Sequence, residues 1–151
     1  MSVVECDSCE RIRTRDRGTA PLWDSIARTD AWDIVHAYDT SLLGWVVVVA
    51  RRHIESIDEL QPDEARELGE LLRSISLGLK IETGCDKTYV MQFAEHPRHP
   101  HVHFHVVPRM ATFPPENVGA NVFNYMGVDD AARVGENEMN SFANGLRKHL
   151  A

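Results

Sequence analysis

The sequence lacks several features that would place the chain in a special class of protein. Its 151 residues contain no apolar run near the ~20 residues that a membrane-spanning helix needs. Residues 1–18 contain no apolar core of the length that a secretory signal requires, so we expect a cytoplasmic protein with reduced cysteines. The formal net charge of −7 provides no basic stripe for a phosphate backbone. We therefore expect no nucleic-acid partner and no membrane partner.

No internal repeat or low-complexity segment divides the chain, and its composition is typical of one globular domain. A chain of this length buries about two thirds of its unfolded surface in one core. We therefore predict a single domain over residues 1–151. Residues 1–20 are expected to be polar and irregular, and residues 111–151 to form a C-terminal extension that ends in a helix.

Hydrophobic periodicity predicts both helices and strands. The stretch from Pro62 to Gly84 carries leucine and isoleucine on one stripe, with proline suited to the first turn and glycine to the end, which predicts a helix. A closing helix is predicted over 136–150. Segments rich in apolar and β-branched residues predict strands at 32–38, 44–50, 88–94 and 101–107. The order indicates an α+β fold in which an antiparallel sheet of about five strands packs with two helices.

Residues 11–17, RIRTRDR, concentrate four arginines in a chain that is acidic as a whole. Such a run is typical of a solvated loop, and this is the interpretation that we favour. Contact with an anion is the alternative.

Cys6 and Cys9 form a Cys-x2-Cys pair close to the start of the sequence. A thioredoxin-like redox pair lies between a strand and a helix, and only five residues precede this one, so redox chemistry is disfavoured. Two small buried cysteines are the plain structural alternative. A structural zinc site needs four nitrogen or sulfur ligands, and His53 with one histidine of residues 99–105 could complete the set. We favour zinc, which would anchor residues 1–20 to the sheet.

Four histidines occupy every second position from His99 to His105. In a strand, residues i, i+2 and i+4 share one face at steps of about 6.7 Å, whereas in a helix neighbours two apart point away from each other. The apolar residues between them, such as Val102 and Phe104, would then face the core. We expect Pro108 to end this strand, because proline has no N–H for the sheet. One face of the strand is thus core, and the other carries imidazoles.

Three interpretations of these imidazoles are open. A histidine on a strand face is usually a polar surface residue, but four in register favour a chemical role. A His-x-His pair can hold a catalytic metal, yet no H-E-x-x-H or comparable partner accompanies it. Neutral imidazole is a nucleophile and an acid–base group, so the row can attack phosphorus, stabilise its oxygens and protonate a leaving group. We favour this third interpretation.

The segment His101–Val107 is similar to the H-φ-H-φ-H-φ-φ signature of the histidine triad (HIT) family, where φ is apolar. Pro108-Arg109 is a common continuation in that family. Asp39 resembles the family's ribose-contacting acid, and residues 44–53 resemble a family strand that ends in a basic pair and a histidine. The resemblance covers roughly residues 1–110, and it implies a HIT-like fold, a nucleotide substrate and a homodimer.

The resemblance also implies a set of zinc ligands. Several zinc-binding members of the family, and the related galactose-1-phosphate uridylyltransferases, carry a Cys-x2-Cys pair together with two histidines. The corresponding residues here are Cys6, Cys9, His53 and His101. His99 is the alternative for the fourth position.

The family's chemistry implies a nucleotide hydrolase or nucleotidyl transferase. His103 would attack the α-phosphorus of a phosphoanhydride of the dinucleoside polyphosphate type, or of a phosphoramidate, and form a nucleotidyl-histidine intermediate. His105 would donate to a non-bridging phosphate oxygen. His101 would orient the middle ring or assist the leaving group; if it binds zinc, His99 or Arg98 would assist instead.

The segment before the triad departs from the family's pattern. Many members have Gly-Gln-x-Val there, whereas residues 96–100 read HPRHP. Arg98 could hold an extra phosphate through a forked contact, and an outward-pointing arginine is the alternative. The predicted substrate-binding residues are Asp39, Gln92, Arg98 and His99.

Two other functions are open from the sequence. One is a non-catalytic nucleotide sensor or partner-binding protein on the same fold, in which the HPRHP segment blocks turnover. The other is a metal-dependent hydrolase that uses the His-x-His strand.

Overall fold

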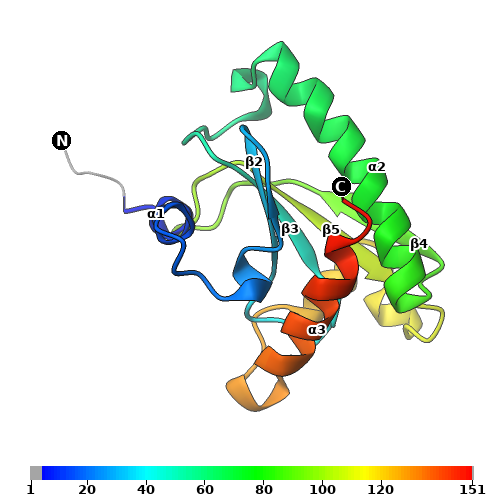
Figure 1. Ribbon diagram of the computed structural model, residues 1–151. Coiled ribbons are helices and arrows are strands. Elements are labelled where there is room, and N and C mark those ends of the chain that lie inside the picture. The colour runs from blue at the N-terminus through cyan, green and yellow to red at the C-terminus, as the bar shows by residue number, and fades with distance from the viewer. Residues whose placement is uncertain (1–4, 151) are drawn as a thin grey trace.

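A computed structural model describes residues 5–150, in which a five-stranded antiparallel sheet carries helices on both faces (Figure 1). The strands follow the spatial order β1-β2-β3-β5-β4, so β5 lies inside the sheet and β4 forms one edge. The strands are β1 (Ala27–Arg28), β2 (Trp32–His36), β3 (Val46–Ala50), β4 (Lys87–Met91) and β5 (His103–Arg109). The α-helices are α1 (Asp7–Asp16), α2 (Pro62–Thr83) and α3 (Glu136–Arg147), and short 3-10 helices occupy several connections. The predicted α+β class with an antiparallel sheet is confirmed.

Side chains alternate between the two faces of the sheet. In β3, Val46 and Val48 belong to the main core, which the sheet shares with α2 and α3. Val47 and Val49 belong to a smaller cluster with Ile12 of α1 on the opposite face. Figure 1 shows α2 and α3 together on one side of the sheet and α1 on the other.

Strand β5 follows the same alternation. Phe104 pairs with Val48 and packs against the main core. His105 pairs with Val47, and His103 lies on the same face as His105. The strand thus has a core face and an imidazole face, as its period of two predicts.

The prediction that Pro108 ends this strand is wrong. Pro108 lies within β5 and pairs with Thr88 of β4. Pairing between β5 and β3 stops at Val106, so β5 has a neighbouring strand on one side only at Pro108. A missing N–H is tolerated at such a position.

The prediction of an irregular N-terminal segment is also wrong, because residues 7–16 form α1. Cys6 caps this helix, since its sulfur accepts a hydrogen bond from the Cys9 N–H at 3.4 Å. Acidic residues in the first turn and arginines in the last turn suit the helix dipole. The cap of this helix is a cysteine. Sequence patterns for helix starts rely on serine, threonine, aspartate or asparagine, so they do not identify it.

The arginines of residues 11–17 are not all solvated, contrary to the loop interpretation. Arg15 is buried, and its guanidinium binds carboxylates of Asp24 at 3.0 Å and Asp33 at 3.1 Å. Arg28 also binds Asp33, at 2.6 Å. This network joins α1 to β2. Removal of one partner would leave a buried charge without compensation, so the attachment is costly to break.

The C-terminal extension contributes to both faces of the sheet. Residues 111–135 run through 3-10 helices, and there Phe123 packs against Trp45 with ring centroids 5.4 Å apart. Helix α3 then joins the main core, where Leu146 is fully buried. The closing helix predicted over 136–150 therefore exists, although it ends at Arg147.

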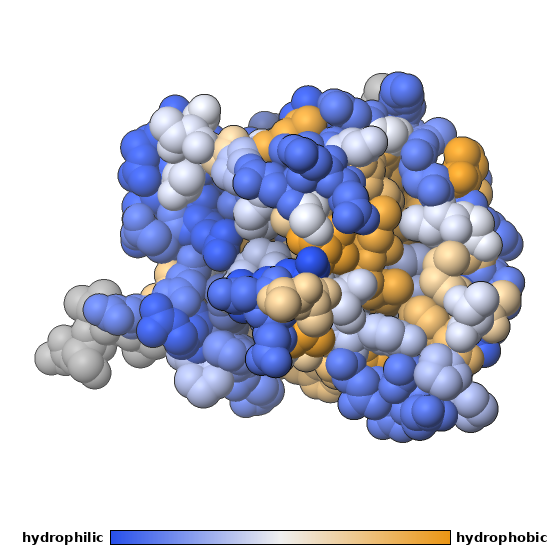
Figure 2. Space-filling view, turned by 90° about the horizontal axis from the view of Figure 1, so that it is seen from below, coloured by the Kyte–Doolittle hydropathy of each residue, from blue (hydrophilic) through white to orange (hydrophobic). Residues whose placement is uncertain are grey.

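The surface is mostly hydrophilic, with local exceptions. Figure 2 shows hydrophobic side chains gathered near the centre of the face seen from below in the view of Figure 1, with hydrophilic ones around them. Across residues 5–150, no helix combines the length and the apolar character that crossing a membrane requires.

The packing of α2 against α3 can be tested at two glycines of α2. A Cβ at Gly78 would lie 2.7 Å from Cδ1 of Leu146, whereas a Cβ at Gly69 would meet nothing within 4 Å. We expect Gly78→Ala to lower the free energy of unfolding by about 1–3 kcal/mol through overpacking. Gly69→Ala should raise it by up to about 1 kcal/mol, because alanine is the better helix former. Urea denaturation measures both variants, and equal effects would contradict this packing.

Candidate functional site

A cavity of about 430 Å³ opens on the face of the sheet that carries the imidazoles. Its apolar floor includes Val35, Val47 and Val49. His103 and His105 of β5 line it as well. The walls come from α1, the connection after β2, the loop after β4 and a C-terminal 3-10 helix, and they include Arg11, Tyr38, Asp39, Phe93, His99 and Phe123.

His103 presents an unprotonated nitrogen to this cavity. Its Nδ1 lies 2.7 Å from the carbonyl oxygen of His101, and a carbonyl can only accept, so Nδ1 carries the proton. Nε2 of the neutral ring is therefore free to act as a nucleophile. Burial lowers the pKa of His103, so the neutral ring predominates near neutral pH.

Trp45 fixes the opposite tautomer in His105. The indole Nε1–H donates to Nδ1 of His105 at 3.0 Å, so the proton of the neutral ring lies on Nε2. Burial, and after it the nearby His103, lowers the pKa of His105 to about 3. His105 thus offers a neutral N–H donor beside His103, with the two ring centroids 4.9 Å apart.

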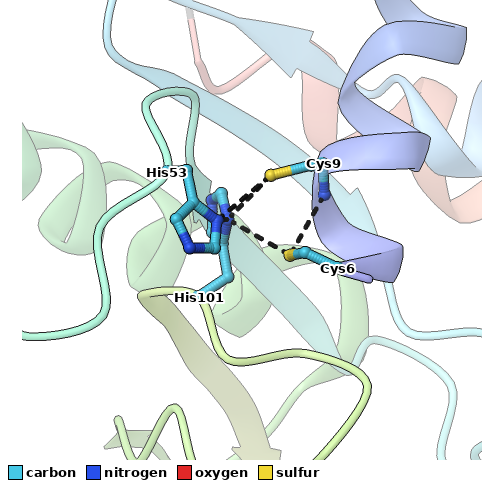
Figure 3. Close-up of side chains that lie close together, drawn as sticks. All are labelled: Cys6, Cys9, His53 and His101. Carbon is cyan, nitrogen blue, oxygen red and sulfur yellow. Dashed lines mark hydrogen bonds between the residues drawn. The ribbon is translucent and has the colours of Figure 1, made fainter. Parts of the chain in front are cut away.

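His101, the first histidine of the triad, points to a different site. It is fully buried, and its Nε2–H donates to the carbonyl oxygen of Ala50 at 2.5 Å. Its Nδ1 faces Cys6, Cys9 and His53 (Figure 3). Burial lowers the pKa of His101, so the neutral ring is favoured and the lone pair of Nδ1 stays free to bind a metal.

These four residues form the Cys6–Cys9–His53–His101 cluster, in which one sulfur or nitrogen atom of each lies within 4.8 Å of the others. Nδ1 of His101 lies 3.6 Å from both sulfurs and 3.2 Å from Nδ1 of His53, which itself lies 3.2 Å from Sγ of Cys9. Zinc bonds of about 2.3 Å to sulfur and 2.0–2.1 Å to nitrogen give tetrahedral edges of about 3.6 Å between S and N and about 3.3 Å between two N. Three of the four separations agree with these edges, and the fourth, 3.2 Å between His53 and Cys9, is about 0.4 Å short, so the four residues fit a zinc ion.

Hydrogen bonds and burial at the cluster also suit a cation. The outer Nε2 of each imidazole is occupied, that of His101 by a backbone carbonyl and that of His53 by a carboxylate oxygen of Glu55 at 3.3 Å. Such contacts direct Nδ1 toward a metal. Burial, and after it the Cys6 thiol, raises the pKa of Cys9 to about 11, so a thiolate here needs a neighbouring cation.

Comparison with known proteins identifies the family. A family model described as the HIT domain matches residues 24–112, which is more than half of the chain. The chain belongs to the HIT family. Among curated proteins, no sequence matches the chain significantly.

Solved structures of other histidine triad proteins share the fold. A hypothetical histidine triad nucleotide-binding protein from Sulfolobus tokodaii has a TM-score of 0.69 at 15% identity, over 94% of this chain and 91% of that one. A histidine triad protein from Sinorhizobium meliloti has a TM-score of 0.69 at 23% identity, over 83% and 88% of the two chains. A zinc-bound histidine triad family protein from Mycobacterium smegmatis has a TM-score of 0.64 at 16% identity, over 96% and 92%. At these identities the likeness establishes the HIT fold alone.

Two of the predicted substrate-binding residues of this HIT protein lie at the cavity. Asp39 and His99 both line it. His99 is not part of the Cys6–Cys9–His53–His101 cluster, and its Nδ1 lies 2.9 Å from the hydroxyl oxygen of Ser8. Burial lowers the pKa of His99 to about 4, so this ring is neutral as well.

The other two predicted substrate-binding residues, Arg98 and Gln92, are not among the residues that line the cavity. Arg98 forms a forked ion pair with Asp7 at 2.7 and 3.0 Å, and its side chain is 68% exposed, which is the outward-pointing alternative. Gln92 follows β4, and its Nε2 is buried with no hydrogen-bond partner in the described part of the chain. The geometry thus gives neither residue a contact at the cavity.

Several residues that line the cavity or contact its lining carry no signal in the sequence that assigns them to the site. Trp45 lies at the start of a valine-rich run, and its contact with His105 joins residues 60 positions apart. The guanidinium of Arg11 lies over the Tyr38 ring, 4.3 Å from the centroid. His96 enters the cavity wall from the loop after β4. The fold alone brings these side chains together.

The Trp45 contact predicts a measurable change in the tautomer of His105. Trp45→Phe keeps an aromatic ring but removes the indole N–H, so Nδ1 of His105 loses its donor. We expect the Nδ1–H tautomer of His105 to rise from a minor to a readily detected population. Imidazole nitrogen chemical shifts measure it, and His103, held by a carbonyl, is the internal control. Unchanged His105 shifts would show that Trp45 does not set this tautomer.

Proposed function

We propose that the protein is a HIT-type nucleotide hydrolase or nucleotidyl transferase that works through a nucleotidyl-histidine intermediate. The observation that carries this proposal is the pair of opposite tautomers in the cavity. His103 offers a free Nε2, and His105 offers an Nε2–H beside it. A nucleophile and a donor for the oxygen of the same phosphate are thus adjacent and neutral.

The proposed reaction has two steps. Nε2 of His103 forms a bond to the α-phosphorus, and the P–O bond breaks with its electron pair moving to the leaving oxygen. When a P–N bond of a phosphoramidate breaks instead, the leaving nitrogen keeps the electron pair and takes up a proton from water. His105 donates its Nε2–H to a non-bridging oxygen of the phosphate, where negative charge is stabilised. Water or another acceptor then attacks the same phosphorus and releases His103.

The cavity supports a nucleotide as the substrate. Its volume of about 430 Å³ lies within the range of small-molecule sites. The apolar floor at Val35 and Val49 suits a base, and Asp39 on the wall is our proposed ribose contact. The imidazoles of His103 and His105 then meet the phosphate.

We expect His103→Ala to lower turnover of diadenosine polyphosphates or of an adenosine phosphoramidate by about 10³-fold or more, because the covalent route is lost. Nucleotide affinity should change far less. Chromatographic product analysis measures turnover, and calorimetry measures binding. His149→Gln is the control, since this histidine bonds to Glu82 at 3.0 Å, does not line the cavity and should leave both quantities unchanged.

Other outcomes separate the alternatives. Turnover that survives the loss of His103 contradicts the proposal. Saturable nucleotide binding without any product from the unaltered protein indicates a sensor or partner-binding protein. Loss of turnover on mild chelation, with the fold intact, indicates a metal-dependent hydrolase.

We also propose that the Cys6–Cys9–His53–His101 cluster holds one structural zinc ion. The agreement of its interatomic separations with tetrahedral edges supports this assignment. When bound, zinc would cross-link the start of α1, the loop after β3 that carries His53, and the segment before β5 that carries His101. The ion would thereby hold α1 on the sheet, while the cavity chemistry rests on His103 and His105.

Cys6→Ser should abolish zinc binding and lower the melting temperature by several degrees, because α1 loses its anchor. Metal analysis should find about one zinc per chain in the unaltered protein, and calorimetry measures the melting temperature. Cys85→Ala is the matched control, since Cys85 is buried in the main core outside the cluster and its removal should leave the zinc in place. Zinc retained in Cys6→Ser would refute the ligand set.

We further propose that the protein is a homodimer that pairs at β4. In the sheet formed by the described residues, β4 has a neighbour on one side only. Val90 of β4 and the α2 residues Leu77 and Ile81 are exposed apolar side chains, and α2 contacts β4. An uncovered strand edge with apolar neighbours is typical of an interface.

Light scattering should therefore give twice the chain mass of 17.1 kDa. Val90→Lys places a charge on the edge strand and should yield monomers. Ile57→Lys, at an equally exposed residue in the 3-10 helix Ile57–Glu59, should leave the dimer intact. An unaltered protein that is monomeric at micromolar concentration would contradict the proposed pairing.

A further inference from the structure

His96 is a fourth imidazole in the cavity and has no part in the proposed reaction so far. It lies between β4 and β5, in the HPRHP segment that takes the place of the family's Gly-Gln-x-Val. Together with His99, His103 and His105 it lines the cavity. The departure from the family's pattern thus adds a polar side chain to the site.

A hydrogen bond fixes which nitrogen of His96 carries the proton. The Arg98 N–H donates to Nδ1 of His96 at 3.1 Å. Nδ1 is therefore an acceptor, and the neutral ring carries its proton on Nε2. Nε2–H takes no part in this contact, so His96 has an N–H donor to offer to a ligand.

The loop that carries His96 is fixed at several points. The His99 N–H donates to the His96 carbonyl oxygen at 2.9 Å. Arg98 pairs with Asp7 through both side chain and backbone, since the Asp7 N–H donates to the Arg98 carbonyl oxygen at 2.8 Å. Ala94 has a φ of 57°, which a residue with a side chain keeps only where its surroundings determine the conformation. The position of His96 is thus built into the fold.

His96 belongs to the same row of rings as the proposed nucleophile. Ring centroids lie 5.3 Å apart for His96 and His99, 6.5 Å for His99 and His103, and 4.9 Å for His103 and His105. Charge on His96 contributes to the lowered pKa of His103, after burial, which reflects their proximity. His99 thus lies next to both His96 and His103, and His105 lies next to His103.

We propose that His96 binds a phosphate oxygen of the leaving group through its Nε2–H and so favours phosphoanhydride substrates. The inference rests on the proposed function, because it takes His103 as the nucleophile. As the bond from His103 to the α-phosphorus forms, the P–O bond to the next phosphate breaks, and its electron pair stays on the departing oxygen. His96 stabilises that charge by hydrogen bonding and transfers no proton.

The donor role of His96 explains why a leaving group with phosphate oxygens is favoured. Its Nε2–H can donate to a phosphate oxygen, which is a hydrogen-bond acceptor. A departing phosphate keeps its negative charge near neutral pH, whereas a departing amine needs a proton. Among the charged residues of the cavity wall, Arg11 attracts the phosphates and Glu95 opposes them.

The experiment compares two substrates that share a nucleotide and differ in the leaving group. A diadenosine polyphosphate loses a phosphate chain, whereas the p-nitrophenyl ester of adenosine 5′-monophosphate loses nitrophenolate, which has no phosphate for His96 to bind. We expect His96→Ala to lower kcat/KM for the polyphosphate by about 10²-fold. The same variant should change kcat/KM for the ester only a few fold. His96→Gln, whose amide keeps an N–H donor, should recover part of the loss.

The control and the outcomes separate this inference from the proposed function. His149→Gln removes an imidazole outside the cavity and should leave both values of kcat/KM unchanged. If His96→Ala affects both substrates equally, or neither, the role of His96 is overturned and the proposed function stands. If the unaltered protein turns over neither substrate, the proposed function is overturned and this inference with it.

Discussion

A hydrogen bond at one nitrogen of each imidazole determines what the other nitrogen can do. The strand backbone places the rings but leaves their tautomers open. A carbonyl oxygen holds the proton of His103 on Nδ1, and the indole of Trp45 leaves that of His105 on Nε2. The carbonyl of Ala50 turns Nδ1 of His101 toward the two cysteines. Similar rings at a spacing of two thereby present a free Nε2, an Nε2–H donor and a free Nδ1 that faces two thiols.

Helix α1 connects the metal cluster with the cavity. Its cap Cys6 and its residue Cys9 contribute to the cluster, whereas Ser8 and Arg11 line the cavity. Arg15 joins the same helix to the sheet through buried ion pairs. The wall of the cavity is therefore attached to the sheet through a guanidinium, and the proposed zinc ion would add a second attachment through the thiols.

The sequence predicts the features that depend on local periodicity or on restricted ligand chemistry. The alternation in β5 follows from backbone geometry. Ligand chemistry points to two cysteines with His53 and one further histidine, and the resemblance to zinc-binding HIT proteins implies that this histidine is His101. The features that the sequence predicts wrongly depend on tertiary contacts. Helix α1 is capped by a sulfur, and Pro108 is tolerated because β3 ends before it. The tautomer of His105 depends on Trp45, which precedes β3. No pattern within residues 99–109 encodes this contact.

The wide separation of the cluster residues along the chain has a consequence for biosynthesis. Cys6 and His101 lie 95 positions apart. The cysteines therefore leave the ribosome well before His101 has been added to the nascent polypeptide. A metal captured early by the two thiols would lack its remaining partners. Until His101 is added, α1 depends on other contacts to hold it, such as the ion pairs of Arg15 with Asp24 and Asp33.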